Sequence, residues 1–316
     1  MLILSRADVE ELLDLEELID ALASAMADLS AGRASVPNRV AALVDEHQGL
    51  LAAMPAYAPG VGALTTKLVS LFPRNAGTRL PTHQAIIAAF DPETGEPLAL
   101  LDGTAITALR TAAGSALSTR LLARENARVL AILGTGVQAR SHARALPLVR
   151  DFEEIRVAGR RRAAAEELSA ELASATAAGS FEEAIRGADV VCATTHALEP
   201  VVRGEWVSAG THVTSVGYDP HGRELDDALV ARSRVFVESR QAALAPVPAG
   251  SPDLANVDEA DVAEIGEVVA GTADGRRSAE EITLYKSVGV GVQDAAAAAL
   301  VLAAARERGS GHRVDV

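Results

Sequence analysis

The segment from Val129 to Ala139 constrains the fold of this chain more than any other. A short apolar run, VLAIL, leads directly into the turn GTGVQA, and a helical pattern follows from Val137. Gly134 permits a tight turn, Gly136 lets a pyrophosphate approach the backbone, and Ala139 is small enough for close helix packing. The free N–H groups of a helix N-terminus favour phosphate. The segment therefore predicts the first strand, turn and helix of a Rossmann-type dinucleotide-binding fold.

Strand-like and helical segments alternate after this turn. Further apolar runs, EIRVAG, DVVCATT, THVTSVG and RVFVES, are mostly separated by helical patterns, and ITLYKSVG comes near the end of the chain. This alternation is typical of a parallel sheet with helices on both faces. We therefore expect a doubly wound dinucleotide-binding domain over residues 126–292, with an irregular excursion over 245–261.

The first 125 residues have a different pattern. Apolar residues at helical spacing predict that the chain opens with an amphipathic helix. Short β-like runs from Asn38 to Asp102 predict an antiparallel meander, in which DPETGEP is a hairpin connection. A long Ala-rich helix is expected over 103–125.

The last helix, over 292–308, is expected to pack back on the first domain. Residues 1–125 and 293–316 would then form one α+β domain for substrate binding and dimerisation. The predicted fold class is α/β, with a Rossmann-type doubly wound sheet inserted into this second domain.

Composition excludes several classes of protein. Lys and Arg total 29 against 43 Asp and Glu, and the net charge of -14 repels polyanions, so no nucleic-acid partner is expected. Cys192 has no second thiol with which to form a disulfide or a zinc site, and we expect a reducing, cytoplasmic compartment. The seven histidines are scattered, and no metal is expected. The longest apolar run is about half a membrane span, so no membrane segment is expected.

The end of the second strand predicts which dinucleotide is bound. NAD-binding domains carry an Asp or Glu about twenty residues after the glycine turn to hold the ribose 2′-hydroxyl. Here the sequence is VAG followed by three arginines. Guanidinium groups pair bidentately with phosphate. We expect Arg160 and Arg161 to hold a 2′-phosphate, so that NADP(H) is preferred over NAD(H); alternatively, the arginines form a solvated helix start.

Three cationic residues of the first domain are candidates for substrate binding. Lys67 lies in VGALTTKLVSLF, Arg110 lies in AITALRTAAGSAL, and Arg39 opens a strand after VPN. Charges within apolar segments are costly unless they are paired or functional. Together the three could hold one substrate carboxylate. Taken alone, each is better explained as a structural ion pair or a snorkelling side chain.

Asp219 follows the strand THVTSVG, at the end of the sheet where open α/β folds bind ligands. A carboxylate there could accept a proton or orient a water molecule. The alternative is a turn residue within YDPHG. His83 and His212 are interpreted as core histidines.

These segments together resemble the ornithine cyclodeaminase and mu-crystallin family. The match includes KLVSLFPRN, HQAIIAAFDPETGEPLALLDG, ITALRTAAGSAL, GTGVQARSHARAL, GADVVCATT, VGYD followed by RELDD, RVFVES and KSVGVGVQD, in order along nearly the whole chain. The resemblance implies a homodimer that pairs through its first domain, which also binds substrate.

The resemblance also implies roles for individual residues. Arg39, Lys67 and Arg110 would hold an amino-acid carboxylate. Asp219 would transfer a proton, with Lys67 as a second catalytic candidate. Beside the residues of the glycine turn, Gly134, Gly136, Val137 and Ala139, the cofactor would be lined by Thr82, Gln138, Thr194, Val216 and Ser287. Hydride would leave the substrate Cα for the nicotinamide and produce an α-imino acid.

One position departs from the family pattern. Ornithine cyclodeaminases carry a Glu just before Met-Pro to hold the distal ammonium, and the aligned residue of GLLAAMP is Ala52. A diamine would place its far charge against an apolar wall there.

The expected function is therefore an NADP(H)-dependent oxidoreductase acting on a small apolar α-amino acid or its imine. Reduction of a cyclic imino acid of the Δ1-pyrroline-2-carboxylate type is favoured slightly over alanine dehydrogenase chemistry. The alternatives are an ammonia-releasing ornithine cyclodeaminase that recycles NAD, and a non-catalytic small-molecule binding protein of the mu-crystallin sort.

Overall fold

The computed structural model describes residues 1–315. By its contacts the chain divides into unit 1, Met1–Arg110 with Val290–Val316, and unit 2, Thr111–Gly289. The sequence places the first boundary at 125, whereas this division falls within the helix α3 (Gly103–Leu122). The second half of α3 contributes Ser115 to unit 2, where its hydroxyl lies 2.9 Å from both His142 Nε2 and Thr214 Oγ1. A continuous helix thus belongs to both units.

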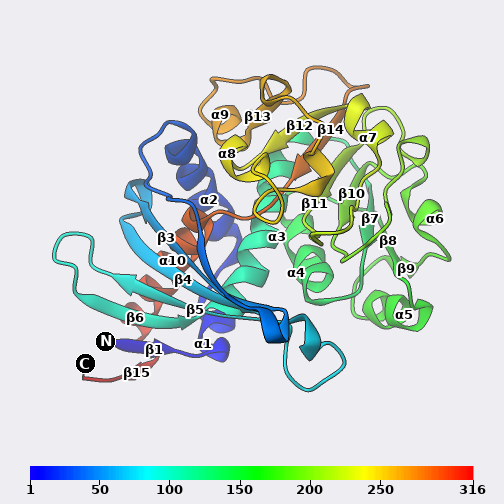
Figure 1. The fold of residues 1–316 in the computed structure, drawn as a ribbon. Coiled ribbons are helices and arrows are strands. Elements are labelled where there is room, and N and C mark those ends of the chain that lie inside the picture. The colour runs from blue at the N-terminus through cyan, green and yellow to red at the C-terminus, as the bar shows by residue number, and fades with distance from the viewer. Residues whose placement is uncertain (316) are drawn as a thin grey trace. The chain divides into compact units, whose positions relative to one another are not determined.

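Unit 1 is built on a seven-stranded sheet with the order β15-β1-β6-β5-β4-β3-β2 (Figure 1). Its sequential antiparallel strands confirm the predicted meander: β2 (Val40–Val44), β3 (Gly49–Ala58), β4 (Ala63–Leu71), β5 (His83–Phe90) and β6 (Pro97–Asp102). The sequence did not predict β1 (Leu2–Leu4), which extends the sheet parallel to β6, or β15 (His312–Arg313), which pairs antiparallel with β1. Both strands are too short to show a period of their own.

The opening helix is divided into α1 (Arg6–Leu12) and α2 (Leu15–Ser30). The Asp14 carboxylate caps α2 by accepting from the N–H groups of Glu16 and Glu17, so the chain restarts its helix there. The last helix, α10 (Gly291–Arg308), packs against α2 and across β3, β4 and β5 within unit 1 (Figure 1). Apolar side chains at alternate strand positions are buried on one face of the sheet.

Unit 2 is a parallel sheet of eight strands with the order β13-β12-β14-β11-β10-β7-β8-β9. The strands are β7 (Val129–Leu133), β8 (Glu154–Ala158), β9 (Ala175–Ala177), β10 (Val190–Ala193), β11 (His212–Ser215), β12 (Ser233–Val237), β13 (Val262–Glu264) and β14 (Ile282–Lys286). The order reverses between β7 and β10, which is the switch point of a doubly wound sheet. The predicted fold class is confirmed.

Short helices connect these strands (Figure 1). They are α4 (Val137–Ala145), α5 (Arg162–Ala170), α6 (Phe181–Ile185), α7 (Asp227–Arg232), α8 (Arg240–Ala243) and α9 (Ile265–Val269). The predicted irregular excursion contains two single turns of 3₁₀ helix, at Pro252–Leu254 and Glu259–Asp261.

A seam of hydroxyl and imidazole groups joins the second half of α3 to the sheet. His212 is fully buried, with its ring nitrogens 3.3 Å from Ser118 Oγ and 3.0 Å from Thr283 Oγ1. Burial lowers the pKa of His212 to about 3, so the ring is neutral at pH 7. The interpretation of His212 as a core histidine is confirmed.

Candidate active site

The glycine turn after β7 has the geometry that a phosphate group needs. Gly134 has a φ of +123°, and a Cβ added there would lie 2.5 Å from Thr194 Oγ1, so only glycine fits. No atom lies within 4 Å of the position of a Cβ on Gly136. The helix α4 then begins at Val137 with no side chain capping its first N–H groups. The turn fits the pyrophosphate of a dinucleotide, which Gly134, Gly136 and the start of α4 would hold.

The other cofactor candidates of unit 2 gather at the carboxyl ends of neighbouring strands. Thr194, Val216 and Ser287 directly follow β10, β11 and β14, which are adjacent in the sheet. Gln138 Oε1, in the first turn of α4, is buried and has no hydrogen-bond partner among the described residues. Such an acceptor costs free energy unless a ligand satisfies it. Thr82 lies in unit 1, where its carbonyl accepts from Phe72 N–H.

The arginines predicted to select NADP(H) lie between β8 and α5. Arg160 and Arg161 are exposed, and their side chains form no hydrogen bond or ion pair within residues 1–315, whereas Arg162 pairs with Glu166 at 2.9 Å. A Cβ on Gly159 would lie 2.8 Å from Thr135 Cγ2, so the end of β8 approaches the glycine turn closely. Two free guanidinium groups therefore follow the second strand, and Arg162 belongs to the helix.

In unit 1, two of the three predicted cations meet at one carboxylate. Lys67 Nζ lies 3.2 Å from Asp294 Oδ1, and Arg110 Nε lies 3.2 Å from the same oxygen. Arg110 also donates to Gln293 Oε1 at 3.0 Å. The three charged side chains are between 1% and 7% exposed. The cluster thus has two buried cations and one carboxylate.

The charges around Lys67 set its protonation. Burial is the main cause that lowers the pKa of Lys67 to about 8; Asp294 opposes it, and Arg110 and Arg39 add to it. Arg39 is exposed and directly precedes β2, and its charge is the smallest of the causes that lower the pKa of Lys67. The structure therefore joins Lys67 and Arg110 at one carboxylate and leaves Arg39 outside that ion-paired cluster.

His83, interpreted from the sequence as a core histidine, is only partly buried and faces this region. Burial is the largest cause that lowers its pKa to about 4, and the charges of Lys67 and Arg110 lower it further. The imidazole is therefore neutral at pH 7 beside the cation cluster.

The sequence interpretation missed the residues that hold the cations. Asp294 and Gln293 lie in the quoted run KSVGVGVQD, yet no role was given to them. Asp294 lies in the first turn of the Ala-rich helix α10. The criterion that selects Lys67, a charged residue within an apolar segment, therefore also applies to Asp294. Two polar atoms here lack a partner among the described residues, Gln293 Nε2 and Thr65 Oγ1.

Asp219 lies in unit 2, in the turn after β11. It is partly buried, and its Oδ1 accepts from His221 N–H at 2.9 Å. This is the turn-residue geometry that the sequence left as an alternative. The second carboxylate oxygen has no hydrogen bond within residues 1–315, and it can still accept a proton.

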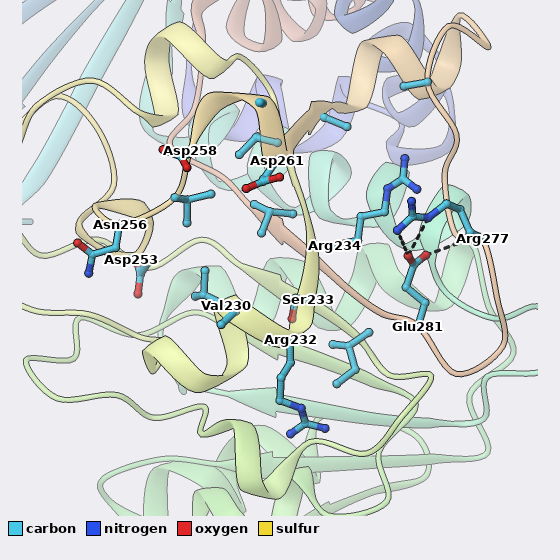
Figure 2. Close-up of a pocket in the computed structure, with 18 of the residues that line it drawn as sticks. Val230, Arg232, Ser233, Arg234, Asp253, Asn256, Asp258, Asp261, Arg277 and Glu281 are labelled. Carbon is cyan, nitrogen blue, oxygen red and sulfur yellow. Dashed lines mark hydrogen bonds and ion pairs between the residues drawn. The ribbon is translucent and has the colours of Figure 1, made fainter.

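A cavity of about 1150 Å³ lies elsewhere in unit 2 (Figure 2). Ser233, Val262 and Ile282, the first residues of β12, β13 and β14, line it. Figure 2 shows the ion pair of Arg277 with Glu281 at its edge. Because open α/β sheets bind dinucleotides at their carboxyl ends, this cavity is not the cofactor site.

Within the described part of the chain, no helix is long and apolar enough to cross a membrane. No group of three metal-ligating side chains gathers within residues 1–315.

Comparisons with known proteins show which family the chain belongs to. The model of the ornithine cyclodeaminase/mu-crystallin family matches residues 1–309. The ketimine reductase mu-crystallin of Mus musculus is 41% identical over 289 residues, which cover 90% of each protein. The Δ1-pyrroline-2-carboxylate reductase of Thermococcus litoralis, solved with NADH and L-proline, has a TM-score of 0.94 and 38% identity, covering 99% of this chain and 100% of that one.

An archaeal alanine dehydrogenase dimer with bound NAD has a TM-score of 0.92 and 34% identity, covering 100% of this chain and 99% of that one. The family model and these relatives extend over nearly the whole sequence, as the quoted segments do. The resemblance is confirmed, and the chain belongs to the ornithine cyclodeaminase/mu-crystallin family.

Proposed function

We propose that this chain is an NAD(P)-dependent oxidoreductase that interconverts a small apolar α-amino acid and its α-imino acid, with reduction of a cyclic imino acid as its main reaction. The observation that carries the proposal is the buried cluster of Lys67, Arg110 and Asp294. Two relatives named for imine reduction support the direction of the reaction.

The charge of the cluster favours an anionic substrate. Two buried cations share one carboxylate, so a net positive charge remains in a region of low dielectric constant. A substrate carboxylate would neutralise it through charge-assisted hydrogen bonds. Gln293 Nε2 and Thr65 Oγ1 are buried polar atoms of the same unit that still need partners.

The wall beside Lys67 favours a small apolar substrate. Lys67 pairs across the sheet with Met54, and Val69 pairs with Ala52. Ala52, Met54, Val69 and Ala85 form one buried apolar cluster. The far ammonium of a diamine would meet no carboxylate in this cluster, which argues against ornithine cyclodeaminase activity.

Lys67 also has the pKa required of a proton donor. With a pKa of about 8 it is mainly protonated at pH 7, yet it loses its proton readily. The bound reduced nicotinamide would supply the hydride. We assign two roles to Lys67: it binds the substrate carboxylate, and it delivers a proton to the imine nitrogen. Asp219 is the alternative proton donor.

The preferred cofactor is proposed to be NADP(H). The side chains of Arg160 and Arg161 have no partner within residues 1–315 and follow β8, the second strand of this unit along the chain, where a 2′-phosphate would lie. The relatives solved with NADH and NAD bind a nicotinamide dinucleotide without the 2′-phosphate. Cys192 is buried and free, which supports a reducing, cytoplasmic location.

We further propose a homodimer formed through the outer face of the unit 1 sheet. Leu51 and Ile86 are 48% and 49% exposed at outward positions of β3 and β5, and Val40 of β2, which pairs with Ala53 on the same face, is 67% exposed. An apolar face of this kind marks a protein interface. The archaeal alanine dehydrogenase relative is described as a dimer.

A substrate panel tests the proposed function. Purified protein is assayed with Δ1-pyrroline-2-carboxylate and with pyruvate plus ammonia, each with NADPH and NADH, and with ornithine in the presence of NADP+ or NAD+. The highest kcat/KM is expected with the cyclic imine and NADPH. Ammonia release from ornithine without net reduction of the cofactor would identify a cyclodeaminase, and cofactor binding without any turnover would identify a binding protein.

A further inference from the structure

Three buried charged residues lie together in unit 2, and none belongs to the chemistry described above. Lys286 is fully buried, and Glu224 and Asp253 are 2% and 4% exposed. Lys286 Nζ lies 2.8 Å from Asp253 Oδ2 and 3.9 Å from Glu224 Oε2. Burying such a network is costly unless each member is hydrogen-bonded. Its hydrogen bonds therefore indicate its role.

The network holds both main-chain groups of Gly217. The Gly217 N–H donates to Glu224 Oε2 at 2.8 Å, and the Gly217 carbonyl accepts from Lys286 Nζ at 2.7 Å. Ser215 Oγ connects the two charges, because it donates to Glu224 at 2.7 Å and accepts from Lys286 at 2.9 Å. A Cβ on Gly217 would collide with the Glu224 carboxyl group and the Thr195 carbonyl, so this approach requires glycine.

The same network extends to the neighbouring strand end. Glu224 Oε1 accepts from the N–H and the hydroxyl of Thr195, which follows the cofactor candidate Thr194. Asp253 Oδ1 in turn accepts from the N–H groups of Glu224 and Leu225 at 2.9 Å each. Asp253 also lies on the wall of the cavity shown in Figure 2. The ends of β10, β11 and β14 are thus connected through buried charges.

We propose that Lys286, together with Glu224 and Asp253, positions the turn 216–219 for hydride and proton transfer. The inference rests on the proposed function. Val216 and Asp219 lie on either side of Gly217 in this turn. A rotation of a peptide plane of Gly217 therefore moves either Val216, a candidate for cofactor binding, or the Asp219 carboxylate. Lys286 is a positioning residue, because its contacts are to the backbone, Ser215 and the two carboxylates.

The test removes the shortest ion pair as a unit. Lys286→Met combined with Asp253→Asn takes away both of its charges. The Glu224 carboxylate keeps its hydrogen bonds from Thr195, Ser215 and Gly217. Because a displacement of about 1 Å can cost on the order of 10²-fold in rate, kcat for imine reduction should fall by about that factor. KM and the Kd for NADPH should change by less than about threefold, since the groups that bind substrate and phosphate are untouched.

Two further measurements separate positioning from general stability. The kinetic isotope effect with NADPH deuterated at the transferred position should rise in the variant, because hydride transfer becomes the slow step. Amide hydrogen exchange of the peptide that covers residues 215–219 should also rise, since the Gly217 carbonyl loses its hydrogen bond from Lys286 and the turn is held less firmly.

Arg240→Met is the matched control. It removes the ion pairs with Glu267 and Glu264, at 2.6 and 3.7 Å, in the same unit but away from the turn. It should lower the Tm with little effect on kcat. Normal kcat in the double variant, an equal loss of kcat in the control, or unchanged exchange over 215–219 would each overturn the proposal. Wild-type protein that reduces no substrate would refute the proposed function, and the exchange measurement would still support or overturn the role of the network in holding the turn.

Discussion

At the scale of single residues, Asp294 determines how the cations of unit 1 are used. It binds Lys67 and Arg110 with one carboxylate oxygen at 3.2 Å each. Its charge raises the pKa of Lys67 against the effect of burial, and the two cations in turn hold the pKa of Asp294 below its usual value. The carboxylate thus keeps Lys67 charged at pH 7 while leaving it able to give up a proton.

The pH dependence of kcat/KM should report this balance. Lys67 can grip a carboxylate and donate a proton only when it is protonated, so activity should be full well below pH 8 and fall as the pH rises through about 8. In Lys67→Arg the rate should be lower, because arginine does not give up a proton, and the alkaline loss should disappear from the remaining activity, because arginine does not titrate in this range. The measurement is a pH profile of imine reduction for both proteins.

Lys67→Met serves as the control for binding. It removes a charge-assisted bond of about 1.5–3 kcal/mol, so KM for the imine should rise on the order of 10- to 100-fold. An alkaline loss that persists unchanged in Lys67→Arg would assign the titration to another group.

At the scale of elements, the turn between β8 and α5 is proposed to select the cofactor. Arg160 and Arg161 are exposed. Arg161 occupies the N-cap position of α5, but its side chain makes no hydrogen bond to the first turn of that helix. Cations near a helix N-terminus are unfavourable unless an anion lies beside them. A 2′-phosphate would be such an anion.

Changing Arg160→Asp together with Arg161→Ala should shift preference from NADPH to NADH. Each charged hydrogen bond to the phosphate is worth about 1.5–3 kcal/mol, so the ratio of kcat/KM for the two cofactors should change by at least on the order of 10²-fold. Arg162→Ala is the control, because Arg162 pairs with Glu166 and should leave this ratio alone. If the ratio is the same in wild type and double variant, these arginines do not contact the phosphate.

At the scale of the whole molecule, the outer face of the unit 1 sheet is proposed to join two copies of the chain. Glutamates at two positions of this face, one on β3 and one on β5, should separate the two copies, because an unpaired buried charge is costly. The double change Leu51→Glu and Ile86→Glu should convert a dimer to a monomer in sedimentation velocity. Leu198→Glu, at a residue of unit 2 that is 65% exposed, should leave the dimer intact. A wild-type monomer, or a dimer in the double variant, would contradict this interface.

The sequence by itself determined the local structure. A strand followed by a glycine turn and a helix can hydrogen-bond its backbone and bury its apolar side chains in few arrangements. The GTGVQA turn, the alternating strands and helices, and the meander could therefore be predicted from hydrophobic periodicity and turn residues. The same local information missed the division of the first helix at Asp14 and the two short strands β1 and β15.

The tertiary structure alone decided which charges meet. Lys67 and Asp294 are 227 residues apart in the sequence. Lys286 lies in β14 and Asp253 lies in the 3₁₀ turn Pro252–Leu254, and no sequence pattern relates these two segments. Their contacts follow from how α10 packs across β4 and how β14 pairs with β11, which are contacts between distant segments. Local periodicity fixes which face of an element is buried, but the partner across that face is set by the register and packing of the whole unit.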